Sequence, residues 1–168
     1  IFVRVDTTLW NCWLLVAYAP QSGLPLCQRE EWWHHLEEVT SCRLASDPMI
    51  VMIDANAAPG EFDGEAVCVH ELRTSVNTPL FRNFVAEHEL FLPCTTSAHI
   101  GEINTWTDPS GSSQHCIDYI LLPKHLLHAC KASQIITEFD LGMSTWDHEA
   151  TAVELEWKDW SLAPLQGS

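Results

Sequence analysis

The chain has 168 residues, of which 46% are hydrophobic and 18% charged, and it carries a formal net charge of −15. This length and composition suit one globular domain with a real core and exclude a disordered chain. No apolar run is long enough to span a membrane. So large a negative charge disfavours polyanionic partners, unless a divalent cation or a basic partner region compensates for it.

The seven cysteines are scattered along the chain, without paired short spacings. That distribution argues against a disulfide framework and against a zinc module. Cys12, Cys116 and Cys130 stand in apolar runs and are expected to be small core residues. We therefore expect an intracellular protein of the nucleus or the cytoplasm.

The chain begins with strand signals. Residues 1–6 and 12–17 are expected to be strands joined through 7–11 in a hairpin-like connection, and 49–53 form a continuous apolar run typical of a strand buried on both faces. The strand-like start, without an initiator Met, indicates a piece cut from a larger protein.

A helix is expected between these strands, over residues 27–44. Trp32, Leu36 and Val39 recur there at helical spacing, and the glutamates lie mostly on other faces. A strand, helix, strand order indicates the α/β class.

Polar side chains follow two of the predicted strands directly. Asp54 and Asn56 come after residues 49–53, and Tyr18 ends the strand before them. The structural interpretation is an Asx-turn for Asp54 and Asn56 and a rim position for Tyr18, with its hydroxyl in water. The functional interpretation is a site, because catalytic groups often lie on loops held by a rigid sheet.

The remaining elements alternate short strands with one helix. Thr78 as N-cap and Pro79 at the first helical position predict a helix to His88, which is expected to be partly buried. We expect surface loops at 61–76 and 138–144, strands near 104–107, 113–123, 129–137 and 150–157, and a flexible tail at 161–168.

Two further strand positions carry ionisable residues. Asp118 is flanked by Ile117 and Tyr119, so its carboxylate needs a charged or hydrogen-bonding partner. A salt bridge could meet that need, but Lys and Arg are scarce, and a histidine is the alternative. Asp147 and His148 stand just before the last strand.

The ordered set of these motifs resembles the endonuclease/exonuclease/phosphatase superfamily. The set is Asp54-x-Asn56, then Thr105-Trp106 with Ile117-Asp118-Tyr119, then Asp147-His148, and Tyr18-Ala19-Pro20 resembles a further stretch of that family. The resemblance covers nearly the whole chain. It implies a deoxyribonuclease I-like α/β fold, a layered β-sandwich flanked by helices, incomplete at its N-terminus, with residues 1–160 as the C-terminal part of the domain.

The resemblance also implies roles for single residues. His148 resembles the histidine that contacts the scissile phosphate or acts in acid–base chemistry, and Asp118 the carboxylate that orients it. Asp54 resembles the aspartate that positions the attacking water, and Asn56 the amide that holds phosphate oxygens. Among the remaining positions, Asp147 resembles a metal-site carboxylate and Tyr18 a phosphate-contacting phenol. We expect an Asp118 oxygen within about 2.6–3.2 Å of a His148 ring nitrogen.

The chain departs from the family pattern at three points. Ile53 stands where the family usually has Gly, and Trp146 where it usually has Ser. The N-terminal half that supplies an Asn and a metal-binding Glu has no counterpart before Tyr18. We therefore expect an incomplete metal site and an apolar sheet face that lacks part of its cover.

The resemblance implies metal-dependent phosphodiester hydrolysis with Mg²⁺, or Mn²⁺ in its place. The first expectation is an endonuclease acting on DNA, such as that of a non-LTR retrotransposon beside a reverse transcriptase. The first alternative is a phosphatase of the same fold, acting on a phosphoinositide or a small phosphate ester. The second alternative is an inactive, truncated remnant that only binds a partner.

Overall fold

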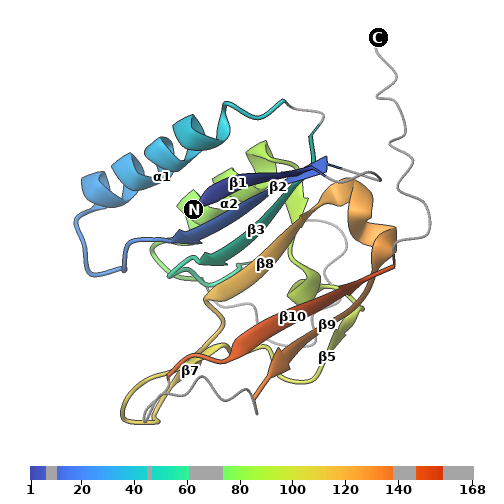
Figure 1. Ribbon diagram of the computed structural model, residues 1–168. Coiled ribbons are helices and arrows are strands. Elements are labelled where there is room, and N and C mark those ends of the chain that lie inside the picture. Colours follow the sequence, from blue (N-terminus) through green and yellow to red (C-terminus); the bar gives the residue numbers. More distant parts are fainter. Residues whose placement is uncertain (7–10, 45–46, 61–73, 138–146, 157–168) are drawn as a thin grey trace.

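The structure, a computed structural model, describes residues 1–6, 11–44, 47–60, 74–137 and 147–156. It has three layers: two helices, a five-stranded sheet and a three-stranded sheet (Figure 1). This is the α/β sandwich flanked by helices that the sequence predicts. No helix in the described ranges is long and apolar enough to cross a membrane. The predicted loop 138–144, the tail, Trp146 and most of the predicted loop 61–76 lie outside the described residues.

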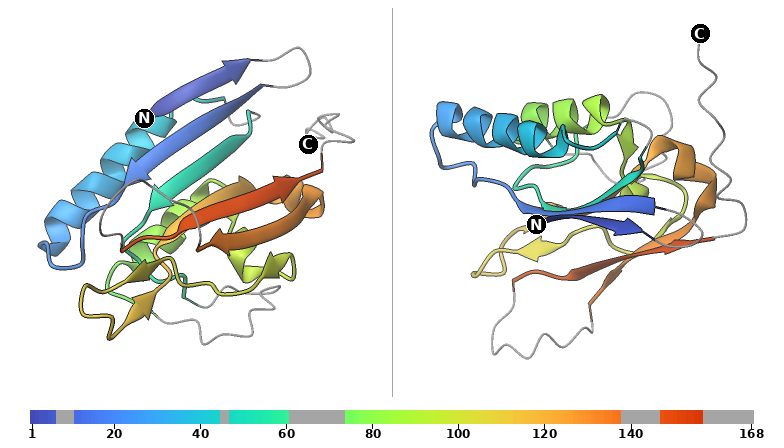
Figure 2. Two further views of the ribbon diagram at one scale, coloured as in Figure 1. Left: turned by 60° about the horizontal axis from the view of Figure 1, so that its bottom comes forward. Right: turned by 45° about the horizontal axis from the view of Figure 1, so that its top comes forward.

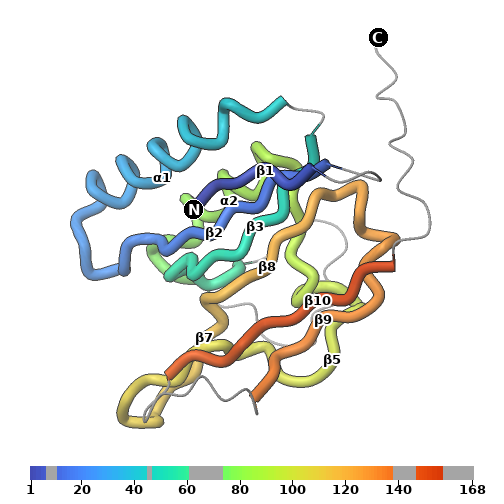
Figure 3. Tube along the Cα trace, in the orientation of Figure 1, coloured from blue at the N-terminus to red at the C-terminus, as the bar shows by residue number. Residues whose placement is uncertain are grey.

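The five-stranded sheet forms the middle layer. Strands β2 and β3 run parallel because helix α1 connects them, and the other neighbours are antiparallel. Figure 3 shows this crossover along the chain trace. The strand order is β1-β2-β3-β8-β4, formed by Phe2–Asp6, Asn11–Tyr18, Met49–Asp54, Asp118–Pro123 and Leu90–Phe91.

A second sheet lies across the face of the first sheet that the helices leave open (Figure 2). Strand β10 contacts β8 and joins the two sheets. A separate two-stranded ribbon, β6 with β7, extends beside the start of β10. The second sheet has the order β10-β9-β5, formed by Ala150–Leu155, Cys130–Ile136 and His99–Ile100, and the ribbon pairs Trp106–Thr107 with Gln114–His115.

Helix α1, Leu26–Thr40, is shorter than the predicted 27–44. The predicted apolar face was also wrong in part, because the side chains that face the core are Arg29, Trp33, Leu36 and Thr40. One of the positions that the prediction misses is Arg29, a buried arginine, which hydropathy spacing assigns to solvent.

Helix α2, Thr78–Glu87, begins one residue earlier than predicted. Its N-cap is Asn77, and Pro79 lies in the first turn. The Thr78 hydroxyl donates to the Ala58 carbonyl, 2.9 Å away, which ties the helix start to the loop after β3. His88 is the C-cap and is half-buried, as predicted.

Two predicted strands are interrupted. Residues 113–123 divide into β7 and β8, so Asp118 is the first residue of β8 rather than an interior position. The break follows from the buried Thr105, whose Oγ1 accepts the backbone N–H groups of Ile117 and Asp118 in place of a strand partner. Residues 104–107 form only the two-residue strand β6. Short 3-10 helices occupy Pro93–Thr95 and Lys124–Ala129.

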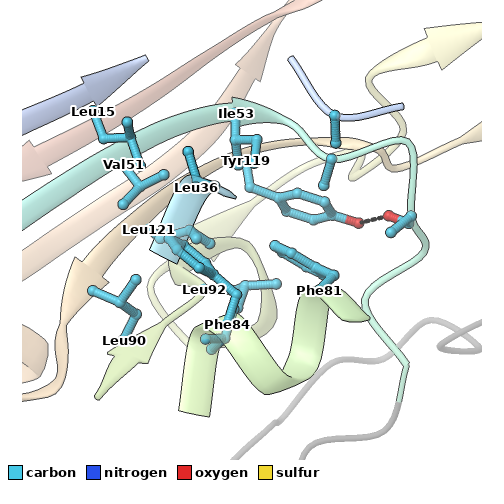
Figure 4. Packing of buried hydrophobic residues seen from close by; sticks show 14 of the residues in the cluster. Leu15, Leu36, Val51, Ile53, Phe81, Phe84, Leu90, Leu92, Tyr119 and Leu121 are labelled. Atoms are coloured by element: carbon cyan, nitrogen blue, oxygen red, sulfur yellow. Dashed lines mark hydrogen bonds between the residues drawn. The ribbon is translucent and has the colours of Figure 1, made fainter. Parts of the chain in front are cut away.

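The core lies between the helices and the first sheet (Figure 4). Residues alternate along β3, so Met49, Val51 and Ile53 point at the helices and are at most 3% exposed. Cys12, Cys116 and Cys130 are buried as predicted. Aromatic rings fill the space between the layers: Trp33, Phe81, Phe84 and Tyr119.

Candidate active site

Three predicted site residues lie side by side across the first sheet. Tyr18 on β2 pairs with Asp54 on β3, and Asp54 pairs with Asp118 on β8. Directly paired residues project to the same face of a sheet. These three side chains therefore share the face opposite the helices, at the end where β2 and β3 finish and β8 begins.

His148 reaches the same end from another layer. Its Nδ1 lies 3.0 Å from Asp118 Oδ2, within the distance predicted from the sequence, and the carboxylate accepts the ring N–H. The backbone bridge between Trp106 and His148 holds the histidine beside the β6–β7 ribbon. A carboxylate partner fixes both the orientation and the tautomer of the imidazole.

Asp54, Asp118 and His148 converge closely enough to share one ion. Each offers one ligand atom, and these atoms lie within 4.8 Å of one another. Two carboxylates and an imidazole, all half-buried, are a ligand set that divalent cations accept.

Asp54 takes part in an Asx-turn with Asn56, which is the structural interpretation that the sequence offers for these two residues. Its Oδ1 accepts the Asn56 backbone N–H at 2.9 Å, and Asn56 has a positive φ of 45°. Burial raises the pKa of the Asp54 carboxyl, the nearby Asp118 and Asp147 raise it further, and the Asn56 hydrogen bond and His148 lower it. The turn uses one oxygen, so the carboxylate keeps Oδ2 for a ligand.

Asn56 and Tyr18 are held differently. Asn56 Nδ2 donates to the Ala19 carbonyl at 2.8 Å, which anchors the amide to the loop after β2. Tyr18 is 60% exposed, and its hydroxyl accepts a long 3.4 Å hydrogen bond from Gln21. Tyr18 therefore has the exposure of a rim residue while it stands next to Asp54.

Asp147 is not one of the three converging side chains. Its exposed carboxylate accepts the Trp106 indole N–H at 3.1 Å, and its backbone carbonyl accepts the Thr107 N–H at 2.8 Å. Asp147 thus lies against the β6–β7 ribbon, beside the site. Its charge acts on Asp54 through space.

A buried polar pair behind the site is not among the predicted site residues. Arg29 is 8% exposed and Asn77 1% exposed, and Asn77 contacts the loops that follow β2 and β3. The sequence marks Asn77 only by its place before Thr78 and Pro79, which is a helix-start signal rather than a site signal.

No protein-family model matches the sequence, and no curated protein matches it. The fold, in contrast, is similar to solved structures. A 3'-5' exonuclease (NExo) from Neisseria meningitidis has a TM-score of 0.65 and 20% identity, over 93% of this chain and 65% of that one. The same Neisseria protein is also described as a 3' phosphatase bound to a product DNA hairpin.

Two further structures are similar over nearly the whole chain. The endonuclease domain of TRAS1, a telomere-specific non-LTR retrotransposon, has a TM-score of 0.63 and 13% identity, over 95% of this chain and 64% of that one. An endonuclease/exonuclease/phosphatase family protein from Leptotrichia buccalis has a TM-score of 0.56 and 18% identity, over 93% of this chain and 52% of that one.

The chain spans less than two thirds of the length of each of these structures. At these identities the similarity is one of fold. The layered α/β architecture agrees with the expectation from the sequence motifs. The described chain has the deoxyribonuclease I-like α/β fold of endonuclease/exonuclease/phosphatase structures.

Proposed function

We propose that the converging side chains form the active site of a metal-dependent phosphodiesterase, a nuclease that acts on DNA. The observation that carries this proposal is the convergence of Asp54, Asp118 and His148, which are 94 residues apart at the extremes (148 − 54) yet offer ligand atoms within 4.8 Å. Burying two carboxylates side by side is unfavourable unless a cation or an imidazolium compensates for their charge.

The proposed roles follow from the hydrogen bonds. Asp118 holds His148 Nδ1, which leaves Nε2 to contact a phosphate oxygen or to transfer a proton. Burial and neighbouring carboxylates raise the pKa of Asp54, which makes its carboxylate a stronger base toward an attacking water. Asn56 Nδ2 uses one N–H on the Ala19 carbonyl and keeps the second for a phosphate oxygen.

Mg²⁺ fits this donor set, and Mn²⁺ fits it equally. Hard cations prefer carboxylate oxygens, and the two carboxylates of the converging group leave most coordination positions to water and substrate. The residues that would hold the ion are Asp54 and Asp118, with Asp147 as a further carboxylate next to them, while His148 keeps Nε2 for the phosphate. A bound divalent cation would neutralise charge on the phosphate oxygens.

Support for a DNA substrate comes from the similar structures. One is a retrotransposon endonuclease domain, and another is bound to a DNA hairpin. A second candidate, removal of a terminal phosphate, is favoured by the description of the Neisseria protein as both a 3'-5' exonuclease and a 3' phosphatase.

The six cysteines of the described ranges are thiols, which supports an intracellular location in the nucleus or the cytoplasm.

The test is hydrolysis of two DNA hairpins, one with an internal fluorescent label and one with a 3'-phosphate. We expect Mg²⁺-dependent cleavage that a chelator abolishes and that Asp54→Asn lowers by at least about 100-fold. Asp108→Asn, at a half-buried aspartate on the β6–β7 turn, is the control and should retain activity. No hydrolysis of either hairpin by a folded protein would overturn the proposal and favour an inactive remnant.

A further inference from the structure

The Asn77 side chain crosses from one site loop to the other. Its Nδ2 donates to the Pro20 carbonyl at 3.1 Å and to the Asn56 carbonyl at 2.8 Å. Pro20 lies in the loop after β2, just beyond Tyr18, and Asn56 lies in the loop after β3. One amide group therefore holds together the two strand ends that present the site.

Asn77 is the N-cap of α2, but its side chain makes no capping hydrogen bond to that helix. An N-cap asparagine ordinarily accepts a backbone N–H from the first turn. Here its Oδ1 instead accepts the Arg29 guanidinium. Both amide protons and the amide oxygen are thus used by groups outside α2, which identifies a tertiary role rather than a helix-capping one.

Arg29 orients that amide from the opposite side. The guanidinium is buried on α1 and also donates to the Leu24 and Val76 carbonyls, at 3.1 Å each. A charged donor on Oδ1 leaves the Nδ2 protons of Asn77 to point at the two loops. Because the pair is buried, replacing either side chain would leave polar groups without partners.

The chain of contacts ends on the site itself. Asn77 binds the carbonyl of Asn56, Asn56 stands in the left-handed region with a φ of 45°, and its backbone N–H binds Asp54 Oδ1. Asparagine tolerates this φ better than most non-glycine residues, and hydrogen bonds on both sides of Asn56 hold it there. The Asn56 side chain donates to the Ala19 carbonyl, which links the two loops a second time.

We propose that Asn77, oriented by Arg29, is a positioning residue that sets the Asp54–Asn56 turn for phosphodiester hydrolysis. The role in catalysis rests on the proposed function. The positioning of the turn does not, because it follows from the contacts alone.

The test is Asn77→Asp, which has nearly the same shape and still accepts the Arg29 guanidinium but cannot donate to the Pro20 and Asn56 carbonyls. We expect kcat on a DNA hairpin to fall by about 100-fold with KM within about threefold, because misplaced catalytic groups lower the rate more than binding. The matched control is Thr95→Val, which removes a buried hydroxyl far from the site, bonded to the Leu92 carbonyl. It should lower the melting temperature and leave kcat unchanged.

A second measurement needs no activity. Amide hydrogen exchange followed by NMR should show faster exchange at Asn56 in Asn77→Asp, with core amides such as Val51 unchanged, and no such change in Thr95→Val. If the wild-type protein hydrolyses nothing, the proposed function fails and this exchange experiment decides the positioning role. Unchanged exchange at Asn56, or an unchanged kcat in an active protein, would overturn the inference. Should Asn77→Asp not fold, Asn77→Ser, which retains an N-cap residue and adds no charge, takes its place in both measurements.

Discussion

At the residue scale, the proposed chemistry depends on the contact between Asp118 and His148. We predict that His148→Ala lowers hydrolysis by about 10²–10⁴-fold, since the imidazole would act directly on the phosphate. Asp118→Asn should lower it less, because the histidine remains but its orientation is lost. Steady-state kinetics with a labelled hairpin measures both. His128→Ala, an exposed histidine outside the site, is the control, and an equal loss there would contradict the assignment.

Asp147 tests whether a carboxylate beside the site contributes to metal binding. Its Oδ2 accepts the Trp106 indole N–H at 3.1 Å, so this oxygen is already used. We predict that Asp147→Asn weakens Mn²⁺ binding several-fold less than Asp54→Asn, as measured by isothermal titration calorimetry. Trp106→Phe retains an aromatic ring and removes the N–H, so this variant should bind Mn²⁺ more tightly. A larger loss in Asp147→Asn than in Asp54→Asn would show that Asp147 is the main ligand.

At this scale the sequence predicts the residues that carry charge, because Asp54, Asp118 and His148 stand at or next to the ends of apolar strands. It does not predict Asn77. A buried amide that bridges two loops depends on contacts 21 and 57 residues away along the chain, and no local pattern encodes them. For the same reason the sequence does not predict that the Trp106 indole N–H binds the Asp147 carboxylate.

At the scale of single elements, the end of α2 carries a group that should make stability depend on pH. Burial lowers the pKa of His88 from its usual 6.5, and the Arg43 charge lowers it further. The unfolded chain therefore binds a proton more readily than the folded one. We predict that the contribution of His88 to the free energy of unfolding is fully present above about pH 6.5 and falls as the pH drops below that value.

Urea unfolding of His88→Gln at pH 8 and pH 5.5 measures this contribution. The variant should lose less stability than the wild-type protein between the two values. His128→Gln, an exposed histidine, should leave the wild-type difference unchanged. Equal pH dependence in the wild-type protein and His88→Gln would contradict the prediction.

The sequence predicts which helices and strands exist better than it predicts which of their side chains face the core. Helical spacing finds α1 and places Leu36 in the core, where Trp32 is partly buried, but it also assigns the exposed Val39 to the core and misses Trp33 and Arg29. The reason is that the Arg29 charge is satisfied by carbonyls and by Asn77, which a hydropathy pattern does not register. Thr105 similarly delays the start of β8, because its hydroxyl oxygen accepts the backbone N–H groups of Ile117 and Asp118.

At the scale of the whole molecule, the two faces of the first sheet differ. On the helix side, Leu15 and Val51 are at most 2% exposed. On the other face, Val3 and Val16 are each 43% exposed, and in the described part of the chain the main contact of β10 with this sheet is at β8. Exposed apolar sheet surface of this kind favours self-association.

We predict that the double variant Val3→Thr, Val16→Thr aggregates less, as measured by light scattering against concentration, with the free energy of unfolding changed by no more than about 0.5 kcal/mol per site. Val51→Thr is the matched control. It places a hydroxyl in the core and should lower the free energy of unfolding by about 1–3 kcal/mol. A wild-type protein that stays monomeric at high concentration would contradict the prediction.

The layered fold is predictable because several signals agree: apolar strands, an intervening helix and polar residues at the strand ends. The packing of β10-β9-β5 across the first sheet is not predictable from those signals. Strand β10 pairs with β9, and β5 joins them from more than 30 residues earlier, a pairing that turn chemistry alone does not specify.

Mn²⁺ binding followed by electron paramagnetic resonance tests most directly whether Asp54 and Asp118 form one metal site beside His148. We predict one Mn²⁺ per chain at the tightest site in the wild-type protein. Asp54→Asn and Asp118→Asn should each weaken that binding by about tenfold or more, since each removes a charged ligand. Asp108→Asn should leave it unchanged, because its carboxylate already binds the hydroxyls of Ser110, Ser112 and Ser113 within the β6–β7 turn. Binding that is insensitive to Asp54 and Asp118, or equally sensitive to Asp108, would contradict a metal site at this end of the sandwich.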